Sequence, residues 1–424
     1  MLDSFHVTTL PNGIKVVTLE KPQAESVQVS IHVRVGSRNE TEALNGASHF
    51  IEHMLFKGTK KRSAKAISHA IEGQGGLINA FTDKDNTCYY AKVPYDKAFS
   101  ALEVLGDLFY NATFDEKELN RERQVIAEEI HMYDDQPDSV AIERLTAQLW
   151  SGHPLGRPIL GPKETILTLP REDLLAYRAA QYAPSRTVFS FAGRIRHDKC
   201  VKAVEKMTHH LVDPTPLREP ETFSRACPQD ALTVTRRAIQ QTQLAFGWRT
   251  PGLHDAATLP TLSILSCALG ESMMSRLFQN IRERKGYCYS IHSGTMLCID
   301  TGALLITAGC EAAKAANCTK AVLKEVRKIA ENPMPAAELR RTRDYLCGRF
   351  RLRMDASPIG WLAGRVLFDL PHDPEATLES FRAVTAQDVQ ALAAELLTPD
   401  RLSLAVVAPE TLTRTDEAWA KLMR

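Results

Sequence analysis

Two histidines and a glutamate stand close together in the segment Ala47–Phe56, which reads ASHFIEHMLF. His49 and His53 are four residues apart, so on a helix they project from one face, one turn apart. Two imidazoles at that spacing can bind one Zn²⁺ ion. Glu52 directly precedes the second histidine, where its carboxylate can act as a base on a water that the metal activates. The pattern predicts metal-assisted hydrolysis.

The alternative for this motif is a solvated helix face that binds no metal. The residues between and after the histidines are mostly apolar: Phe50, Ile51, Met54, Leu55 and Phe56. They predict a largely buried helix, and buried imidazole and carboxylate groups need partners. Metal binding is therefore the stronger interpretation.

A third ligand must come from elsewhere, because a hydrolytic zinc site has three protein ligands and one open position. The segment Glu122–Glu129 reads ERQVIAEE and offers Glu122, Glu128 and Glu129. Glu122 and Glu129 are seven residues apart and share a helix face, whereas Glu128 points about 100° away from Glu129. One of the shared-face pair could bind the metal while the other orients a histidine. The residues alone do not choose among the three carboxylates.

The elements that must position these groups occur in two similar halves. Leu169–Gly193 and Val384–Ala408 each read as an amphipathic helix, a proline turn and a buried strand. Phe114–Ile126 and Met334–Leu346 form a second similar pair, in the same order. Two such pairs indicate an internal duplication.

Four prolines between Leu211 and Asp230 separate the halves. They disfavour both a helix and a central strand, so this stretch predicts an extended linker. We therefore expect a zinc-binding catalytic domain over residues 1–210, a linker over 211–230 and a homologous domain over 231–424. The second half has Thr261–Gly270 (TLSILSCALG) where the histidine motif would fall, so we expect one metal site per chain.

Strand and helix patterns alternate within each half. Predicted strands are Ser26–Val35, Leu232–Thr235 and Gln243–Trp248, and predicted helices are Ala98–Asn111, Asp115–Met132 and Ala312–Glu331. Strands grouped with helices favour an α+β class: two homologous sandwich domains, each a mostly antiparallel sheet packed with helices.

The composition excludes several classes of partner. The chain has 52 Lys+Arg against 51 Asp+Glu, which leaves no basic field for nucleic acid or an anionic membrane surface. No apolar run approaches the ~20 residues that span a bilayer, and the N-terminal segment lacks a secretory pattern. The nine cysteines include no CxxC pair, which predicts free thiols and a cytoplasmic location.

With these motifs in place, the sequence resembles the pitrilysin/insulinase (M16) zinc peptidases, whose motif is His-x-x-Glu-His. It looks closest to short bacterial members similar to the β subunit of the mitochondrial processing peptidase. In that family the third ligand is a glutamate about 76 residues past the second histidine, in a segment like E-R-x-V-I-x-x-E. The resemblance therefore implies Zn²⁺ as the cofactor, Glu129 as the third ligand and Glu122 as its supporting carboxylate.

A glycine-rich segment, Gly75–Thr82, resembles the edge strand on which the family binds substrate. By that resemblance, Gly76, Asn79, Ala80 and Phe81 contact a peptide that adds to the sheet as an extra strand, so that main chain is recognised. The alternative is a plain turn that leads into a strand.

The segment Arg282–Tyr289 resembles the family's arginine and tyrosine seven residues apart. The resemblance implies that Arg282 and Tyr289 hold the substrate carbonyl, since a guanidinium or a phenol can stabilise an oxyanion. The alternative is a charged helix end with the tyrosine in the core. The chain departs from the family at Leu269–Ser275, which has fewer glycines than the usual stretch.

The resemblance as a whole implies a zinc metalloendopeptidase that cleaves extended peptides or unfolded segments. A closed chamber in this family needs four half-units, so we expect a homodimer or a heterodimer with a homologous subunit. Two alternatives remain, a catalytically silent structural subunit and a dedicated maturase for one precursor. The intact motif argues against the first, and genomic neighbourhood would test the second.

Overall fold

Six strands form a mixed sheet in the order β1-β2-β6-β3-β5-β4. Its pairs are antiparallel except β2 with β6. The strands are β1 (Phe5–Thr9), β2 (Lys15–Glu20), β3 (Ser26–Val33), β4 (Leu77–Thr82), β5 (Thr87–Pro94) and β6 (Thr187–Gly193). The computed structural model describes residues 5–224 and 228–423, so Cys227, one of the predicted free thiols, lies outside the described residues.

A second sheet has the order β7-β11-β8-β10-β9, with one parallel pair, β7 with β11. The strands are β7 (Leu232–Arg237), β8 (Gln241–Thr250), β9 (Ser290–Leu297), β10 (Gly302–Glu311) and β11 (Ser403–Pro409). Counted from β4 in the first sheet and from β9 in the second, the parallel pair joins the fourth and fifth strands of both sheets. A short proline turn precedes both β6 and β11. The fold is therefore α+β with two related sheet-and-helix domains, as predicted, and the matching topology supports an internal duplication.

The chain divides into two compact units that are discontinuous in sequence. Unit 1 comprises residues 1–130, 157–221 and 355–372, and unit 2 comprises 131–156, 222–354 and 373–424. These units are not the same as the halves 1–210 and 231–424, because each unit includes a helix from the other half. The helices concerned are α5 (Pro137–Leu149) in unit 2 and α12 (Pro358–Leu367) in unit 1.

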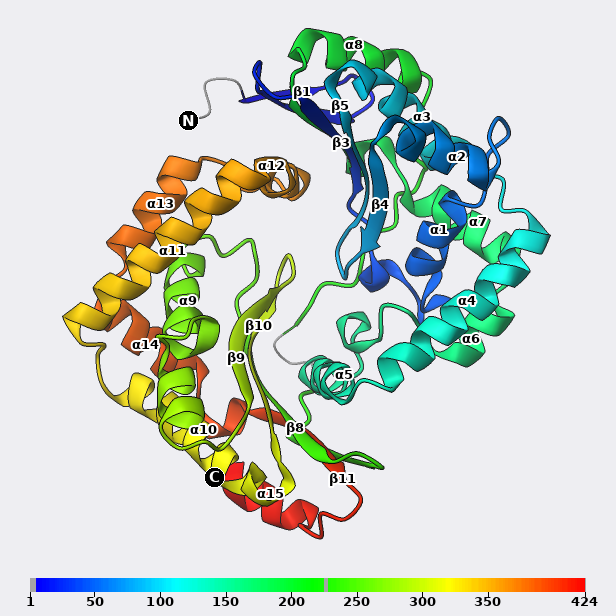
Figure 1. The fold of residues 1–424 in the computed structure, drawn as a ribbon. Helices are drawn as coiled ribbons and strands as arrows, with labels where there is room; N and C mark the ends of the chain where they lie inside the picture. The colour runs from blue at the N-terminus through cyan, green and yellow to red at the C-terminus, as the bar shows by residue number, and fades with distance from the viewer. Residues whose placement is uncertain (1–4, 225–227, 424) are drawn as a thin grey trace. The chain divides into compact units, whose positions relative to one another are not determined.

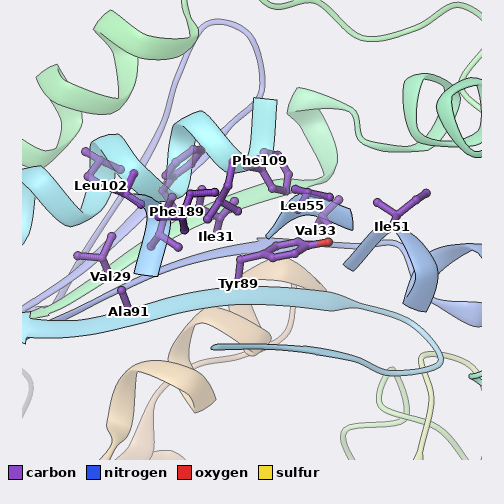
Figure 2. Packing of buried hydrophobic residues seen from close by; sticks show 14 of the residues in the cluster. Val29, Ile31, Val33, Ile51, Leu55, Tyr89, Ala91, Leu102, Phe109 and Phe189 are labelled. Atoms are coloured by element: carbon purple, nitrogen blue, oxygen red, sulfur yellow. The ribbon is translucent and has the colours of Figure 1, made fainter. Parts of the chain in front are cut away.

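Helices of unit 1 cover one face of the first sheet. They are α1 (Ala47–Leu55), α2 (Ala64–Ile71), α3 (Ala98–Asn111), α6 (Lys163–Thr168), α7 (Arg171–Gln181) and α8 (His197–Thr208). The long helix α4 (Glu116–Asp134) begins in unit 1 and ends in unit 2. Figure 2 shows part of the core between the sheet and these helices, where Leu55 of α1 lies beside Val33 of the sheet; Ile51, on the same helix, belongs to the same cluster. This packing fixes α1 against the sheet. The opposite face of the sheet packs on α12.

Unit 2 repeats this plan. The remaining helices are α9 (Leu259–Ser266), α10 (Ala315–Glu331), α11 (Ala336–Ala356), α13 (Pro374–Ala383), α14 (Ala386–Leu396) and α15 (Asp416–Met423). Helices α9, α10 and α14 pack together on one side of the second sheet (Figure 1), and α5 covers the other side. Among the described residues, no helix is long and apolar enough to span a bilayer.

Candidate metal centre

Helix α1 carries the histidine motif and begins abruptly after a glycine. Gly46 precedes the helix with φ 99°, a left-handed conformation that glycine adopts without steric cost. An added Cβ there would lie 2.5 Å from the Leu160 carbonyl oxygen, so the close contact between Gly46 and the main chain at Leu160 also requires glycine. The apolar side chains of α1 pack into the core, and this packing turns His49 and His53 to a common side.

His49 and His53 meet a carboxylate from α4. Their ring centroids lie 4.6 Å apart. The Nε2 atoms of His49 and His53 lie 3.8 Å and 3.6 Å from Oε2 of Glu129. Among the described residues, these three side chains form the one cluster whose ligand atoms all lie within 4.8 Å of one another.

Glu122 supports His53 from the other side of the ring. Its Oε2 lies 3.0 Å from Nδ1 of His53, and Lys57 lies 2.7 Å from its Oε1. Burial raises the pKa of Glu122, but the hydrogen bonds from His53 and Lys57 outweigh this and hold it below its ordinary value. An ionised Glu122 accepts the Nδ1 proton, so the Nε2 lone pair of His53 faces Glu129.

The cluster fits a zinc ion. A metal ~2.0–2.1 Å from each ligand needs ligand atoms less than about 4 Å apart, and both histidine–glutamate separations satisfy this. Burial, and to a lesser extent the neighbouring His53, lowers the pKa of His49 to about 3, which keeps its imidazole neutral and able to donate a lone pair. The two imidazoles and one carboxylate are a donor set that zinc uses in hydrolytic sites.

Glu52 lies beside the cluster, close enough to interact electrostatically with His53 and Glu129. Its Oε2 accepts a hydrogen bond from the hydroxyl of Thr82, the last residue of β4. Burial raises the pKa of Glu52, and the Thr82 hydrogen bond lowers it in part. A carboxylate with a raised pKa is better matched to taking up and releasing a proton near neutral pH.

Strand β4 is at the edge of the first sheet, and α1 lies beside it (Figure 1). Asn79, Ala80 and Phe81 belong to β4, and Gly76 directly precedes it. An added Cβ at Gly76 would lie 2.8 Å from Cγ1 of Val93, so the entry to the strand has no room for a side chain. Phe81 is 46% exposed, although it is a large apolar residue. The predicted substrate-binding residues therefore lie along an accessible sheet edge next to the motif helix.

Arg282 and Tyr289 lie together in unit 2. Nε of Arg282 donates to the main-chain oxygen of Tyr289 at 2.8 Å, and its guanidinium stacks on the Phe278 ring at 4.5 Å. The Tyr289 hydroxyl accepts from Gln243 at 3.2 Å, and the residue is 53% exposed. Nη1 of Arg282 donates to the carboxylate of Glu283 at 3.0 Å. Tyr289 is therefore not a core residue, and both side chains lie at the surface of unit 2.

Sequence reasoning missed three residues that this geometry singles out: Lys57, Thr82 and Glu40. Lys57 follows His53 by one helical turn, which is a usable signal for a partner of Glu122. Thr82 lies 30 residues from Glu52, so no local pattern could reveal that contact. Glu40 lies five to eight residues before the groups that it contacts, a spacing that matches no standard capping pattern. Burial raises the pKa of Glu40 to about 7, against the lowering by hydrogen bonds from Asn45, Ser48 and the main chain.

Family models match both halves of the chain. Residues 15–163 match the model described as Insulinase (Peptidase family M16), and residues 168–346 match the model described as Peptidase M16 inactive domain. The first match contains His49, His53 and Glu129, and the second contains Arg282 and Tyr289.

Curated relatives and solved structures agree with these matches. The chain is 35% identical over 425 residues to an uncharacterized zinc protease of Mycobacterium leprae, covering 98% of this chain and 94% of that protein. It is 34% identical over 408 residues to the uncharacterized zinc protease YmxG of Bacillus subtilis, covering 95% and 97%. A solved protease from Helicobacter pylori has the same fold, with a TM-score of 0.88 at 22% identity over 96% of this chain and 100% of that one.

Proposed function

The chain belongs to peptidase family M16, and from this premise we propose that it is a zinc metalloendopeptidase that hydrolyses extended peptides or unfolded protein segments. Zn²⁺ is its cofactor. The observation that carries the proposal is the convergence of His49, His53 and Glu129 within 4.8 Å, with the Glu52 carboxylate beside them.

Each residue of the cluster has a distinct part in the proposed reaction. His49, His53 and Glu129 hold the ion, and Glu122 fixes the tautomer of His53. When bound, Zn²⁺ supplies Lewis acidity, which lowers the pKa of a water molecule and polarises the peptide carbonyl. Glu52 takes the proton from the attacking water and passes it to the nitrogen of the leaving amine. Thr82 holds the Glu52 carboxylate in place through its hydroxyl.

Substrate specificity in this proposal depends on main chain more than on side chains. An extended peptide adds to β4 as a further strand, because an edge strand presents unpaired N–H and C=O groups. Gly76, Asn79, Ala80 and Phe81 line that edge. Arg282 and Tyr289 stabilise the developing oxyanion, a part supported by their exposed polar groups and by the resemblance of their spacing.

The setting of the enzyme is part of the same proposal. We place it in the cytoplasm, supported by the eight described cysteines, none of which is in a disulfide. We place it in a dimer, either of two copies or with a homologous subunit. This rests on the family resemblance and on the duplication within the chain.

Substitution of Glu52 tests the function directly. Glu52→Gln should keep about one zinc per chain and lose turnover of a denatured peptide by ~10²–10⁴-fold, because only proton transfer is removed. Zinc content is measured by atomic absorption, and turnover with a quenched fluorescent peptide. Chelation with 1,10-phenanthroline should abolish wild-type activity, and zinc should restore it. Unchanged turnover in Glu52→Gln would contradict the mechanism, and a zinc-loaded wild type that cleaves no peptide would support a silent subunit.

A further inference from the structure

A buried carboxylate that is not a ligand lies at the start of the motif helix. Glu40 is in the loop between β3 and α1 and is 3% exposed. Its Oε2 accepts hydrogen bonds from the main-chain N–H of Gly46 at 2.8 Å and from Nδ2 of Asn45 at 3.0 Å. Its Oε1 accepts from the main-chain N–H of Ser48 at 2.7 Å. The carboxylate thus binds the start of α1 through Ser48 in its first turn, Gly46 at its N-cap and the Asn45 side chain just before it.

The beginning of α1 needs such a partner. The first N–H groups of a helix have no acceptor within the helix, and a side chain at the preceding position usually supplies one. Here that position is Gly46, which has no side chain and is held in its left-handed conformation. Glu40 supplies the acceptor from six residues upstream, and its charge also complements the positive end of the helix dipole.

The position of His49 depends on this first turn. His49 is the third residue of α1, whereas His53 lies a turn further in. The ring of His53 is held at Nδ1 by Glu122. Nδ1 of His49 is buried and has no hydrogen-bond partner among the described residues. The main chain of the first turn and the surrounding packing therefore determine where the His49 ring lies. If the turn shifts, no hydrogen bond at Nδ1 holds the ring in its position.

The loop that carries Glu40 is itself tied to the end of β4. The N–H groups of Ser37 and Arg38 donate to the carbonyl oxygens of Asp83 and Lys84 at 3.2 Å and 3.0 Å. Gly36 allows this close approach, because an added Cβ would lie 2.1 Å from the Asp83 oxygen. The loop thus connects the turn after the edge strand to the helix that holds the metal ligands.

We propose that Glu40 is a positioning residue for the metal centre: its carboxylate fixes the first turn of α1, and through it His49, relative to the β4–β5 turn. The inference rests on the proposed function to the extent that His49, His53 and Glu129 hold the zinc. Glu40 touches neither the metal nor the substrate. Its effect is on how tightly and in what geometry the ion is held.

Zinc affinity, measured apart from catalysis, tests this role. Glu40→Gln keeps the shape of the side chain but replaces one acceptor oxygen with a donor, so at least one N–H of the first turn loses its partner. We expect zinc affinity to fall ~10–100-fold at about pH 8, measured by competition with a fluorescent chelator. The absorption spectrum of the Co²⁺-substituted protein should change in the same variant, since the ligand geometry changes.

Two further variants separate positioning from general stability. Asp373→Asn is the matched control, because Asp373 caps α13 through Glu375 and Ala376 and belongs to unit 2. It should keep wild-type zinc affinity and the wild-type Co²⁺ spectrum even if the melting temperature falls. Glu40→Asp keeps the charge with a shorter reach, and should give an intermediate affinity. It also serves as the test if Glu40→Gln does not fold.

The outcomes distinguish this inference from the proposed function. Wild-type zinc affinity and an unchanged Co²⁺ spectrum in folded Glu40→Gln, or in Glu40→Asp, would overturn the role of Glu40 while leaving the peptidase intact. If the wild-type chain cleaves no peptide but the Glu40 variants bind zinc more weakly than wild type, the role of Glu40 is supported and the proposed peptidase activity is overturned. If wild type binds no zinc, both fail.

Discussion

At the scale of single residues, the two carboxylates at the end of the ERQVIAEE segment have different surroundings. Glu129 is half-buried and faces His49 and His53, whereas its neighbour Glu128 is exposed. Periodicity alone could place Glu122 and Glu129 on one face, but it could not say which bound the metal. The resemblance chose Glu129, and the distances to the histidines support that choice.

This difference gives a matched pair of variants. Glu129→Gln should lose most of its zinc, because removing one of three ligands leaves two imidazoles that hold the ion weakly. Glu128→Gln neutralises the adjacent carboxylate and should keep about one zinc per chain and wild-type turnover. Both are measured by metal analysis after dialysis. Zinc loss from Glu128→Gln, with retention in Glu129→Gln, would reverse the ligand assignment.

A buried histidine outside the metal centre makes the stability of the chain depend on pH. His32 lies within reach of Ser190 and Cys88, and burial lowers its pKa to about 4. The unfolded chain takes up this proton near pH 6.5 and the folded chain only near 4, so the unfolded state binds more protons in between. Stability is therefore lost as pH falls through this window, by ~3 kcal/mol from this group.

His32→Gln should remove that part of the acid sensitivity. The free energy of unfolding of the zinc-free chain, measured by urea titration between about pH 7 and pH 4, should fall less steeply in the variant than in wild type. His69→Gln, which removes an exposed imidazole on α2, should follow the wild-type curve. Parallel curves for wild type and His32→Gln would show that His32 is not the group responsible.

At the scale of elements, the helices and strands that the sequence predicted lie close to where they were expected. The helix expected at Ala98–Asn111 has those bounds, and the strand expected at Ser26–Val35 ends two residues earlier, at Val33. Such agreement is expected because hydrophobic period reports which face of an element is buried. It does not report which element covers that face. The sequence therefore could not predict that α5, from the first half, packs in unit 2, or that α12, from the second half, packs in unit 1.

The edge strand β4 leads to a prediction about substrates. In an added strand, only every second residue directs its N–H toward the edge strand. A series of peptides, each N-methylated at one position near the cleaved bond, should therefore show KM raised at alternate positions and nearly unchanged between them. A uniform effect along the series, or none, would contradict recognition by strand addition. Single side-chain exchanges in the same peptide should change KM less.

Helix α12 provides a test of packing in unit 1. Leu362 is fully buried in α12, which lies on β2, β3 and β6. Leu362→Ala should lower the free energy of unfolding by ~2–5 kcal/mol, because it removes buried apolar contacts and leaves a cavity. The control is Leu352→Ala on α11, where the side chain is 70% exposed and the expected change is within ~0.5 kcal/mol. Urea unfolding midpoints compare the two.

At the scale of the whole molecule, the exchange of helices makes the two halves depend on each other. In β2 and β6, Val16 and Phe189 face the main core of unit 1, so by strand alternation Val17, Leu19 and Val188 face the side that α12 covers. All three are buried in the whole chain. A fragment of residues 1–210 keeps His49, His53 and Glu129 but lacks α12, and so exposes this apolar strip.

We expect the fragment 1–210 to bind the dye ANS and to unfold with low cooperativity, because a sheet face that is apolar and uncovered cannot pack. A synthetic peptide of residues 355–372, which contains α12, should raise its melting temperature and reduce dye binding. The same peptide with Leu362→Asp should do neither, since a carboxylate cannot be buried on that face without a partner. The opposite result would be a fragment 1–210 that unfolds cooperatively, binds no dye and is not stabilised by the peptide. It would mean that the first domain folds without α12 and that the linker at 211–230 is a folding boundary.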